Sequence, residues 1–357
     1  MLLILLLVMY KYDKEVIQTL LDDEKQVLKD LTENYIDALA GIKRKVKVLL
    51  ADIESTHLQS KIYQLQYQQS LEQQISGYLN ILQNENIETV EKFLRKCYED
   101  AFIGNVYSLQ QQNIPLLFPI DQTQLIQSVM KQTEGYTFSD RLYNNISKLQ
   151  KVVKSEIIRG LATQLSYAQI ARNISDYGEA DMNRSMRIAR TEGHRVQNTA
   201  RLDSMNAAKK KGADIVKQWD ATLDGITRPH HRQLDGQIRE LDEPFEVAGM
   251  KVEAPGGFGL ASEDCNCRCC VLQRARWAVD KGFHTRYLGK TENMTDEQLL
   301  PTAQKLHISV DELRKYGGQI IPVESTDYKD FSRKYKKIWN YEGSDFQKEV
   351  ENRGPAY

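Results

Sequence analysis

Four of the five cysteines in this 357-residue chain lie within one six-residue stretch, and two adjacent histidines, His230 and His231, precede them. Thiolate and imidazole are the ligands that structural zinc prefers, usually four in a tetrahedron. The sequence therefore offers a candidate zinc site made of His231, Cys265, Cys267 and Cys269. The one-residue spacing of Cys267 and Cys269 places both on one side of an extended strand, but it is not the two-residue spacing typical of zinc knuckles. Reduced cysteines packed into a small core are the alternative.

A catalytic site is a second interpretation of the same residues. With Asp224 and Asp235, His231 and the cysteines could form a hydrolytic centre, because a metal with an open position lowers the pKa of bound water. However, neither histidine is followed two residues later by the glutamate of zinc deaminases. The glycine-rich run at 255–259 lacks the Lys-Ser/Thr pair of a phosphate loop, and the chain has no His-Glu-x-x-His run and no Gly-x-Ser-x-Gly elbow. We therefore expect no enzymatic activity, with a metal-dependent hydrolase as the rival.

A basic segment precedes the cysteine cluster. From Arg184 to Lys217 there are nine Lys or Arg against three acids, in a chain whose net charge is −1. Such a local excess favours a polyanion, such as DNA bound without sequence preference, or an acidic protein surface as the partner. The alternative is a solvated helix face in which Glu192 and Arg195 pair with each other. The candidate binding residues are Arg187, Arg190, His194, Arg195 and Arg201.

Long helices must position these residues. Between Val16 and Asn84 the chain has no proline, and its apolar residues recur at spacings of three and four, which predicts helix with one packed face. The main stripe consists of Leu28, Leu31, Tyr35, Ala38, Ile42, Val46, Leu49 and Ile53. This pattern is typical of a structural rod or bundle helix, although a narrow apolar seam can also pair with another chain.

Further helices and a turn-rich module follow. We expect a helix at 88–103, a break at 110–119, and helical structure at 122–172 with Asp121 as its N-cap. That structure should end near Gly178, and a new helix should cover 181–212. Alternating polar and apolar residues at 237–241 and 245–252 predict a β-hairpin that turns at Ala248-Gly249, and 269–272 a closing strand. Two short helices are expected within 294–316; the tail from 326 carries no recognisable motif.

Composition is consistent with a soluble, helix-rich protein, since 41% of residues are hydrophobic and 27% are charged. Few cysteines outside one cluster favour a reducing compartment. The apolar start MLLILLLVM is about half the length of a membrane span and lacks the preceding positive charge of a signal peptide. We expect it to be a buried terminal element or to result from a start codon assigned too far upstream, and we expect no membrane partner.

Four blocks in the middle of the chain carry a family resemblance. They are IARTEGHRVQNTAR at 188–201, WDATLDGITRPHHRQLDGQ at 219–237, DEPF at 242–245 and NCRC at 266–269. In this order they resemble the phage Mu F-like minor head proteins, also called phage head morphogenesis proteins, over roughly residues 150–272. The matching positions are Arg190, Thr191, Glu192, Arg195, Asn198, Arg201, Asp224, Thr227, Arg228, His231, Leu234, Asp235, Gly236, Cys267, Arg268 and Cys269. Cys265 and Cys270, which flank the last block, depart from the family pattern.

The resemblance implies a function in phage head assembly. Members are encoded beside portal and scaffold genes, are incorporated into the head in few copies, and are associated with the portal and with DNA packaging or ejection. It implies portal, capsid or scaffold proteins as partners and a place inside the virion head, with the host cytoplasm as the site of assembly from a phage or prophage. Some relatives carry toxin domains after this region, so a particle-delivered toxin is a rival, and a nucleic-acid-binding protein is another.

The expected fold is α+β and mainly α. A helical N-terminal region at 1–115 and a helical connector at 116–180 lead to the Mu F-like module at 181–272, and a helical appendix at 273–357 follows it. The module is expected to be small, turn-rich and to contain the Cys/His cluster.

Overall fold

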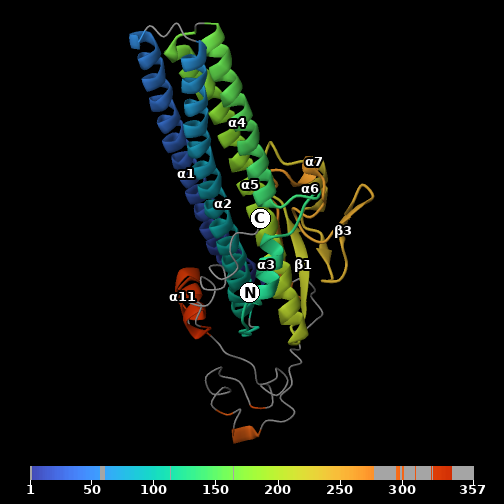
Figure 1. Cartoon of the computed structure of the whole chain (residues 1–357). Coiled ribbons are helices and arrows are strands. Elements are labelled where there is room, and N and C mark those ends of the chain that lie inside the picture. Colours follow the sequence, from blue (N-terminus) through green and yellow to red (C-terminus); the bar gives the residue numbers. More distant parts are fainter. Residues whose placement is uncertain are drawn as a thin grey trace.

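The computed structural model describes residues 2–56, 61–112, 114–163, 165–276, 295–297, 300, 310, 323 and 325–339. Four long helices run side by side as an elongated bundle, and a small β-containing module lies against one side of it (Figure 1). The helices are α1 (Leu2–Thr56), α2 (Lys61–Gln111), α4 (Phe138–Ala162) and α5 (Tyr167–Lys210). The fold is therefore α+β and mainly α, as the sequence predicts.

The predicted apolar stripe of α1 forms part of the bundle core. Leu31, Tyr35, Ile42 and Val46 are buried, whereas Leu49 and Ile53 have side chains outside the described set. The stripe also includes a polar contact, because the Tyr35 hydroxyl donates to Asp181 on α5 at 2.6 Å. Each helix thus buries one face against its neighbours, as expected for amphipathic helices in a bundle.

Helix α5 is longer than its pattern predicts. The expected end near Gly178 is wrong, since the helix continues from Tyr167 to Lys210. A Cβ atom at Gly178 would lie 2.7 Å from both Cδ atoms of Leu39, so this glycine permits close packing of α5 on α1 rather than ending the helix. The helix begins at a capping box formed by Ser166 and Gln169.

The segment at 122–172 contains two breaks. Asp121 caps α3 (Gln122–Val129), accepting from the main-chain nitrogens of Thr123 and Gln124, as predicted. The chain then turns through Glu134 and Gly135, both with positive φ, before α4 begins. The first prolines coincide with the end of α2, which confirms the break expected at 110–119.

The module is built on two small antiparallel sheets. Strand β1 (Ile215–Asp220) is central and pairs with β2 (Ile238–Arg239) and β5 (Cys270–Ala275). Strands β3 (Phe245–Val247) and β4 (Met250–Val252) form the predicted hairpin, with Ala248 and Gly249 at positive φ in its turn. Two short helices, α6 (Pro229–Leu234) and α7 (Ala261–Asp264), lie in the connections. Residues 237–241, expected in the same hairpin, instead contribute β2 to the other sheet.

Helix α11 (Tyr328–Ile338) packs on α2 near the end of the bundle where the module's sheet lies (Figure 1). Its buried residues are Tyr328, Phe331 and Tyr335, and the Tyr335 hydroxyl donates to the carbonyl of Phe118 at 2.5 Å. The helices expected within 294–316 lie almost entirely outside the described residues. No helix in the described part of the chain is long and apolar enough to cross a membrane.

Candidate functional site

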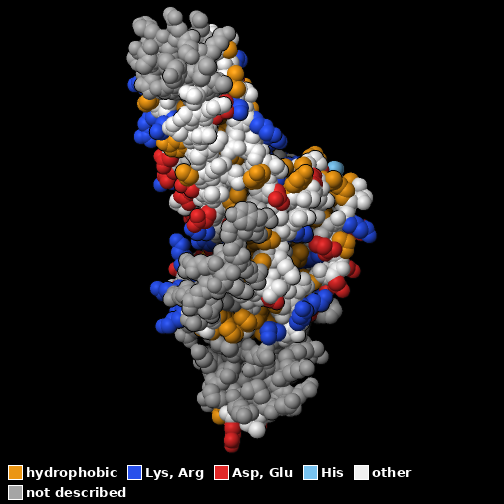
Figure 2. Space-filling model, in the orientation of Figure 1, with side chains coloured by type: hydrophobic (Ala, Val, Ile, Leu, Met, Phe, Trp, Pro, Cys, Tyr) orange, Lys and Arg blue, Asp and Glu red, His pale blue; other side chains and the backbone are white. Residues whose placement is uncertain are grey.

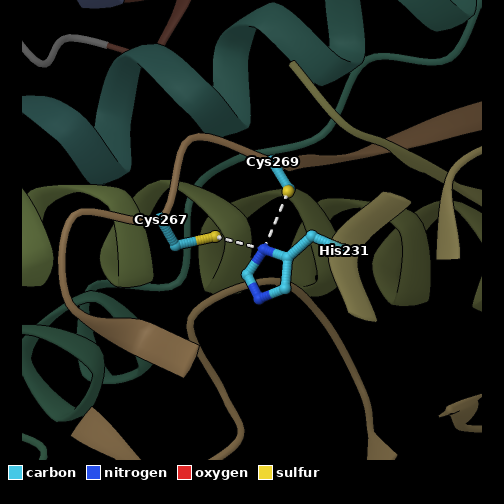
Figure 3. Close-up of side chains that lie close together, drawn as sticks. All are labelled: His231, Cys267 and Cys269. Atoms are coloured by element: carbon cyan, nitrogen blue, oxygen red, sulfur yellow. Dashed lines mark hydrogen bonds between the residues drawn. The ribbon is translucent and has the colours of Figure 1, made fainter. Parts of the chain in front are cut away.

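His231, Cys267 and Cys269 meet inside the module. His231 lies on α6, and both cysteines lie in the segment that leads into β5 (Figure 3). The His231 Nδ1 atom is 3.2 Å from the Cys269 Sγ and 3.6 Å from the Cys267 Sγ, and all three ligand atoms lie within 4.8 Å of one another. All three residues are buried. A tetrahedral zinc ion has bonds of about 2.0–2.3 Å to nitrogen and sulfur, so this spacing fits three corners of its coordination shell.

The far side of the imidazole faces a carboxylate. Nε2 of His231 lies 3.2 Å from Oε2 of Glu263 on α7, although the two atoms lack hydrogen-bond geometry. The other oxygen of Glu263 is 3.1 Å from Nδ1 of His230. Metal-bound histidines commonly direct their second nitrogen at a carboxylate, which fixes the ring and its tautomer. Glu263 carries no signal in the sequence, because no spacing rule connects α7 to α6.

The predicted fourth ligand, Cys265, does not join this cluster. It is half-buried and outside the three-residue group, and its carbonyl accepts a hydrogen bond from Arg228 at 2.6 Å. Cys270 also points elsewhere, since its thiol contacts Asp220. The imidazole of His194 on α5 instead approaches from the bundle, with Nε2 against the carbonyl of Cys269 and the ring beside the Cys267 thiol. His194 thus lies beside the cluster, although it is not one of the three residues whose donor atoms are all within 4.8 Å of one another.

The two thiols have opposite pKa shifts. A hydrogen bond from Cys269, supplemented by contacts with His194 and His231, lowers the pKa of Cys267 well below its usual value. The same hydrogen bond, together with burial, raises the pKa of Cys269. The two opposite shifts thus have one common cause, the contact between the two thiols.

Other family-motif residues hold the module in place. Asn198 on α5 donates to the carbonyl of Cys269 at 3.2 Å and accepts from the main-chain nitrogen of Val271 at 2.9 Å. Asp235 accepts from the main-chain nitrogen of Ala221, and Gly236 adopts a positive φ that follows α6. Thr191 accepts from the main-chain nitrogen of Asn266 at 3.2 Å. These contacts connect α5, α6 and the strand ends around the cluster.

An exposed ion pair closes the turn before α6. Arg268 contacts Asp224 through two nitrogens, at 2.5 and 2.8 Å, and this contact holds the pKa of Asp224 well below its usual range. Thr227 donates to Asp224 at 3.0 Å. Asp224, Thr227 and Arg268 thus stabilise the loop before α6, and they do not surround an open cleft.

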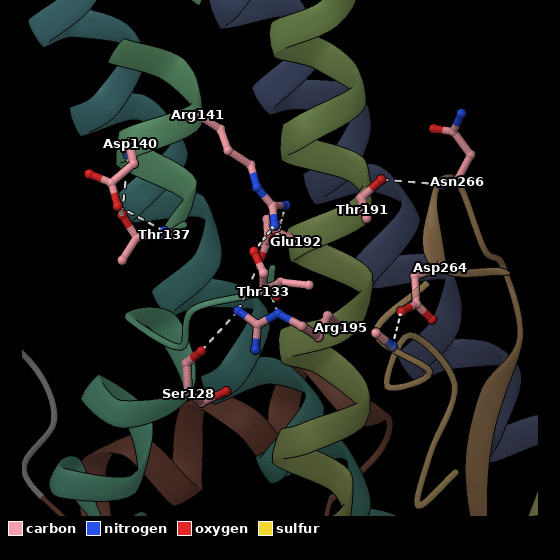
Figure 4. Close-up of polar contacts among 11 residues, drawn as sticks. Ser128, Thr133, Thr137, Asp140, Arg141, Thr191, Glu192, Arg195, Asp264 and Asn266 are labelled. Carbon is pink, nitrogen blue, oxygen red and sulfur yellow. Dashed lines mark hydrogen bonds and ion pairs between the residues drawn. The ribbon is translucent and has the colours of Figure 1, made fainter. Parts of the chain in front are cut away.

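The predicted basic face divides into buried and exposed residues. Arg195 and Arg201 are each only 5% exposed, so they do not form part of a surface for nucleic acid. Arg195 bonds to Glu192, as the alternative interpretation of this helix supposed, and Glu192 also accepts from Arg141 on α4 at 2.8 Å (Figure 4). Arg187 and Arg190 are exposed, and Arg190 lies 3.3 Å from Glu24 on α1. Arg141 was not foreseen, because its partner is 51 positions away.

Residues 151–272 match a family model described as phage Mu protein F like protein. This segment of the chain belongs to the Mu F-like family. It is 33% identical over 209 residues to the minor head protein GP7 of Bacillus phage SPP1, a match that covers 57% of this chain and 65% of that protein. The Mu F-like segment thus includes α5, the module and the three clustered residues.

A second relative is named for an enzymatic activity. The chain is 34% identical over 241 residues to a protein of Enterococcus faecalis named NAD(+)--arginine ADP-ribosyltransferase EFV. That match covers 67% of this chain and 49% of the enterococcal protein. The chain thus spans about half the length of one of these relatives and about two thirds of the other. No solved structure matches the chain.

Proposed function

We propose that this Mu F-like protein acts in phage head assembly, is retained in the head beside the portal, and takes part in DNA packaging or ejection. The observation that carries the proposal is the similarity to the minor head protein GP7 over about two thirds of that protein. The partners would be portal, capsid or scaffold proteins, and the place of action the virion head after assembly in the host cytoplasm. A bundle of long helices with a small attached module suits a protein that contacts other proteins.

The proposal is tested by the contents of phage particles. Purified heads and proheads are analysed by mass spectrometry, and the portal protein is co-expressed with this chain and purified through a tag on the portal. We expect a few copies per head and co-purification with the portal. Absence from both heads and proheads would overturn the proposal. Presence in heads without binding to the portal would overturn the assigned location beside the portal.

We further propose that the His231–Cys267–Cys269 cluster holds one structural zinc ion. The support is the spacing of the three donor atoms and the carboxylate behind His231. His194, whose ring lies beside the Cys267 thiol, would become the fourth ligand in place of Cys265 by leaving the carbonyl of Cys269, and this would join α5 to the module. Elemental analysis of protein purified without a His tag should give one equivalent of zinc. We expect loss of the metal in Cys267→Ser and in His194→Ala but not in Cys265→Ser; a full equivalent retained by His194→Ala would refute the fourth-ligand assignment.

An activity as a toxin is the second candidate, because the enterococcal relative is named an arginine ADP-ribosyltransferase. We propose that this chain has no such activity, since the match covers only 49% of the enterococcal protein and the sequence has none of the enzyme signatures named above. The measurement is transfer of labelled ADP-ribose from NAD to an arginine-rich acceptor protein. Incorporation above that of a heat-denatured control would favour the toxin instead.

A further inference from the structure

A cleft of about 650 Å³ lies between the bundle and the module. One wall is formed by the facing sides of α4 and α5, another by the loop that carries α7, and the turn between α3 and α4 closes one end. Figure 4 shows this region, with Arg141 and Arg195 reaching Glu192 between the helices. Asp264 and Cys265 line the cleft, whereas His231, Cys267 and Cys269 do not, so the cleft is separate from the cysteine cluster.

Two buried donors line this cleft without an acceptor. Arg195 uses Nε for Glu192 and Nη2 for the carbonyl of Ser128, but its Nη1 has no hydrogen-bond partner. Asn145 is 9% exposed, and its Nδ2 also has no partner. A buried donor without an acceptor is unfavourable, so a ligand group that accepts hydrogen bonds would be stabilised beside these two side chains.

The charges of the lining favour an anionic group. The acids of the cleft are already engaged: Glu192 accepts from two arginines, and Asp264 accepts from the main-chain nitrogens of Phe258 and Gly259. Glu134 at the exposed turn is the remaining acid. Two exposed cations, Lys148 on α4 and Arg187 on α5, line the cleft and form no ion pair within the described part of the chain. The cleft therefore has an excess of donors and of positive charge.

The lining also includes apolar side chains. Leu260 is 47% exposed and Tyr136 is 52% exposed, and both lie in the lining with the half-buried Ile188. Exposed apolar groups beside cations suit a ligand that carries both an acidic and an apolar group. Duplex DNA does not suit the buried donors, because the phosphates of a rigid double helix cannot follow a narrow cleft to atoms that are almost fully enclosed.

We propose that this cleft binds an acidic peptide segment of a partner protein, with a carboxylate against Arg195 and Asn145 and an adjacent apolar side chain against Ile188 and Leu260. The carboxylate would supply the acceptors that both donors lack, and charge-assisted bonds of this kind are among the stronger ones. Lys148 and Arg187 would attract the acidic segment to the mouth of the cleft. The proposal concerns the chemistry of the ligand and holds whether or not the partner is a head protein.

The test is a selection from a randomised twelve-residue displayed peptide library on the full chain, followed by anisotropy measurements with the selected peptides. We expect the selected peptides to be enriched in Asp or Glu next to apolar residues. The Lys148→Glu/Arg187→Glu double variant should bind them about tenfold more weakly. A matched control, Lys47→Glu/Lys151→Glu, makes the same change in net charge at exposed lysines outside the cleft and should leave the affinity unchanged.

A second variant separates ligand binding from folding. Asn145→Leu removes the unsatisfied donor but keeps a side chain of similar shape, so thermal stability should be equal or higher while peptide affinity falls several-fold. Failure to enrich acidic peptides would overturn the proposal. Equal weakening by the cleft and control double variants would also overturn it, as would Asn145→Leu with unchanged affinity, or a twenty-base-pair duplex that competes fully with the peptide.

Discussion

Single side chains of the Mu F-like motif act mainly as connectors between backbone segments. Asn198 is the clearest example, because it is fully buried and satisfies one carbonyl and one main-chain nitrogen at the start of β5. Because Asn198 lies on α5, its two hydrogen bonds attach the cysteine segment to this helix. A residue of this kind affects the cluster without being one of its ligands.

We expect Asn198→Ala to lower the free energy of unfolding by about 2–4 kcal/mol, because two main-chain groups lose partners in a buried site. Chemical denaturation followed by tryptophan fluorescence measures the change. Asn183→Ala is the matched control: this residue is exposed on the same helix, so its change should stay within about 0.5 kcal/mol. A loss at Asn198 no larger than that of the control would show that the two bonds are not formed.

The hairpin turn contains a residue that is not the best for its conformation. Ala248 has φ 49°, next to Gly249 at 78°, whereas turns with two positive φ values favour Asn-Gly. We expect Ala248→Asn to raise the free energy of unfolding by roughly 0.5 kcal/mol, because Asn tolerates the left-handed region better. Ala248→Val should lower it, since a β-branched residue at positive φ is strained. Thermal melts of both variants give the sign of each change in stability. Equal changes in the two variants would contradict the positive φ assigned to Ala248.

At the scale of elements, the local pattern was sufficient to predict the helices but not their partners. The stripe in α1, the Asp121 cap and the Ala248-Gly249 turn depend on neighbours within a few positions, and all three are confirmed. Contacts between distant segments had no such signal. Examples are Tyr35 with Asp181, and Glu263 behind His231. Gly178 was misread because a glycine within a helix and a glycine that ends one look the same in sequence.

The candidate cluster was predicted in part. The sequence indicated His231, Cys267 and Cys269, and the structure brings them together. Cys265 was included because it lies close in sequence, yet the turn at Asn266, with φ 51°, separates it from the others. His194 was assigned to the basic face on helical spacing alone. Only the packing of α5 against the cysteine segment shows that it faces the cluster. Whether a metal is bound stays a prediction.

Removal of the metal should separate the two parts of the molecule. If zinc joins α6, the cysteine segment and α5, a chelator should unfold the module while the part of the bundle around Tyr35 and Ile146, whose buried core is separate from that of the module, keeps its helices. Trp219 lies in the module with its ring centroid 5.9 Å from that of His231. In a variant whose other two tryptophans, Trp277 and Trp339, are changed to Phe, tryptophan fluorescence therefore reports the module. We expect a fluorescence change with little loss of helical circular dichroism. Simultaneous loss of both signals would mean that the module and bundle unfold as one unit.

On the scale of the whole molecule, the basic segment does not give the chain a net positive charge. The chain has a net charge of −1, and Figure 2 shows Lys, Arg, Asp and Glu side chains interspersed over the visible face of the bundle. Of the five predicted binding residues, Arg195 and Arg201 are buried and His194 faces the cysteine segment. Of these five residues, only Arg187 and Arg190 are therefore exposed and able to contact DNA.

We expect weak, non-specific DNA binding, with a log-log salt slope of about −2 rather than the roughly −4.5 that five phosphate contacts would give. Arg187→Ala/Arg190→Ala should remove most of the salt dependence, because these are the two predicted residues that remain exposed. Arg201→Ala should instead lower thermal stability and leave the slope unchanged, since this side chain is buried. Fluorescence anisotropy with a labelled duplex at several salt concentrations measures the slope. A slope near −4.5 that decreases in Arg201→Ala would mean that α5 opens to bind DNA, and the assignment of its buried arginines to packing would then be wrong.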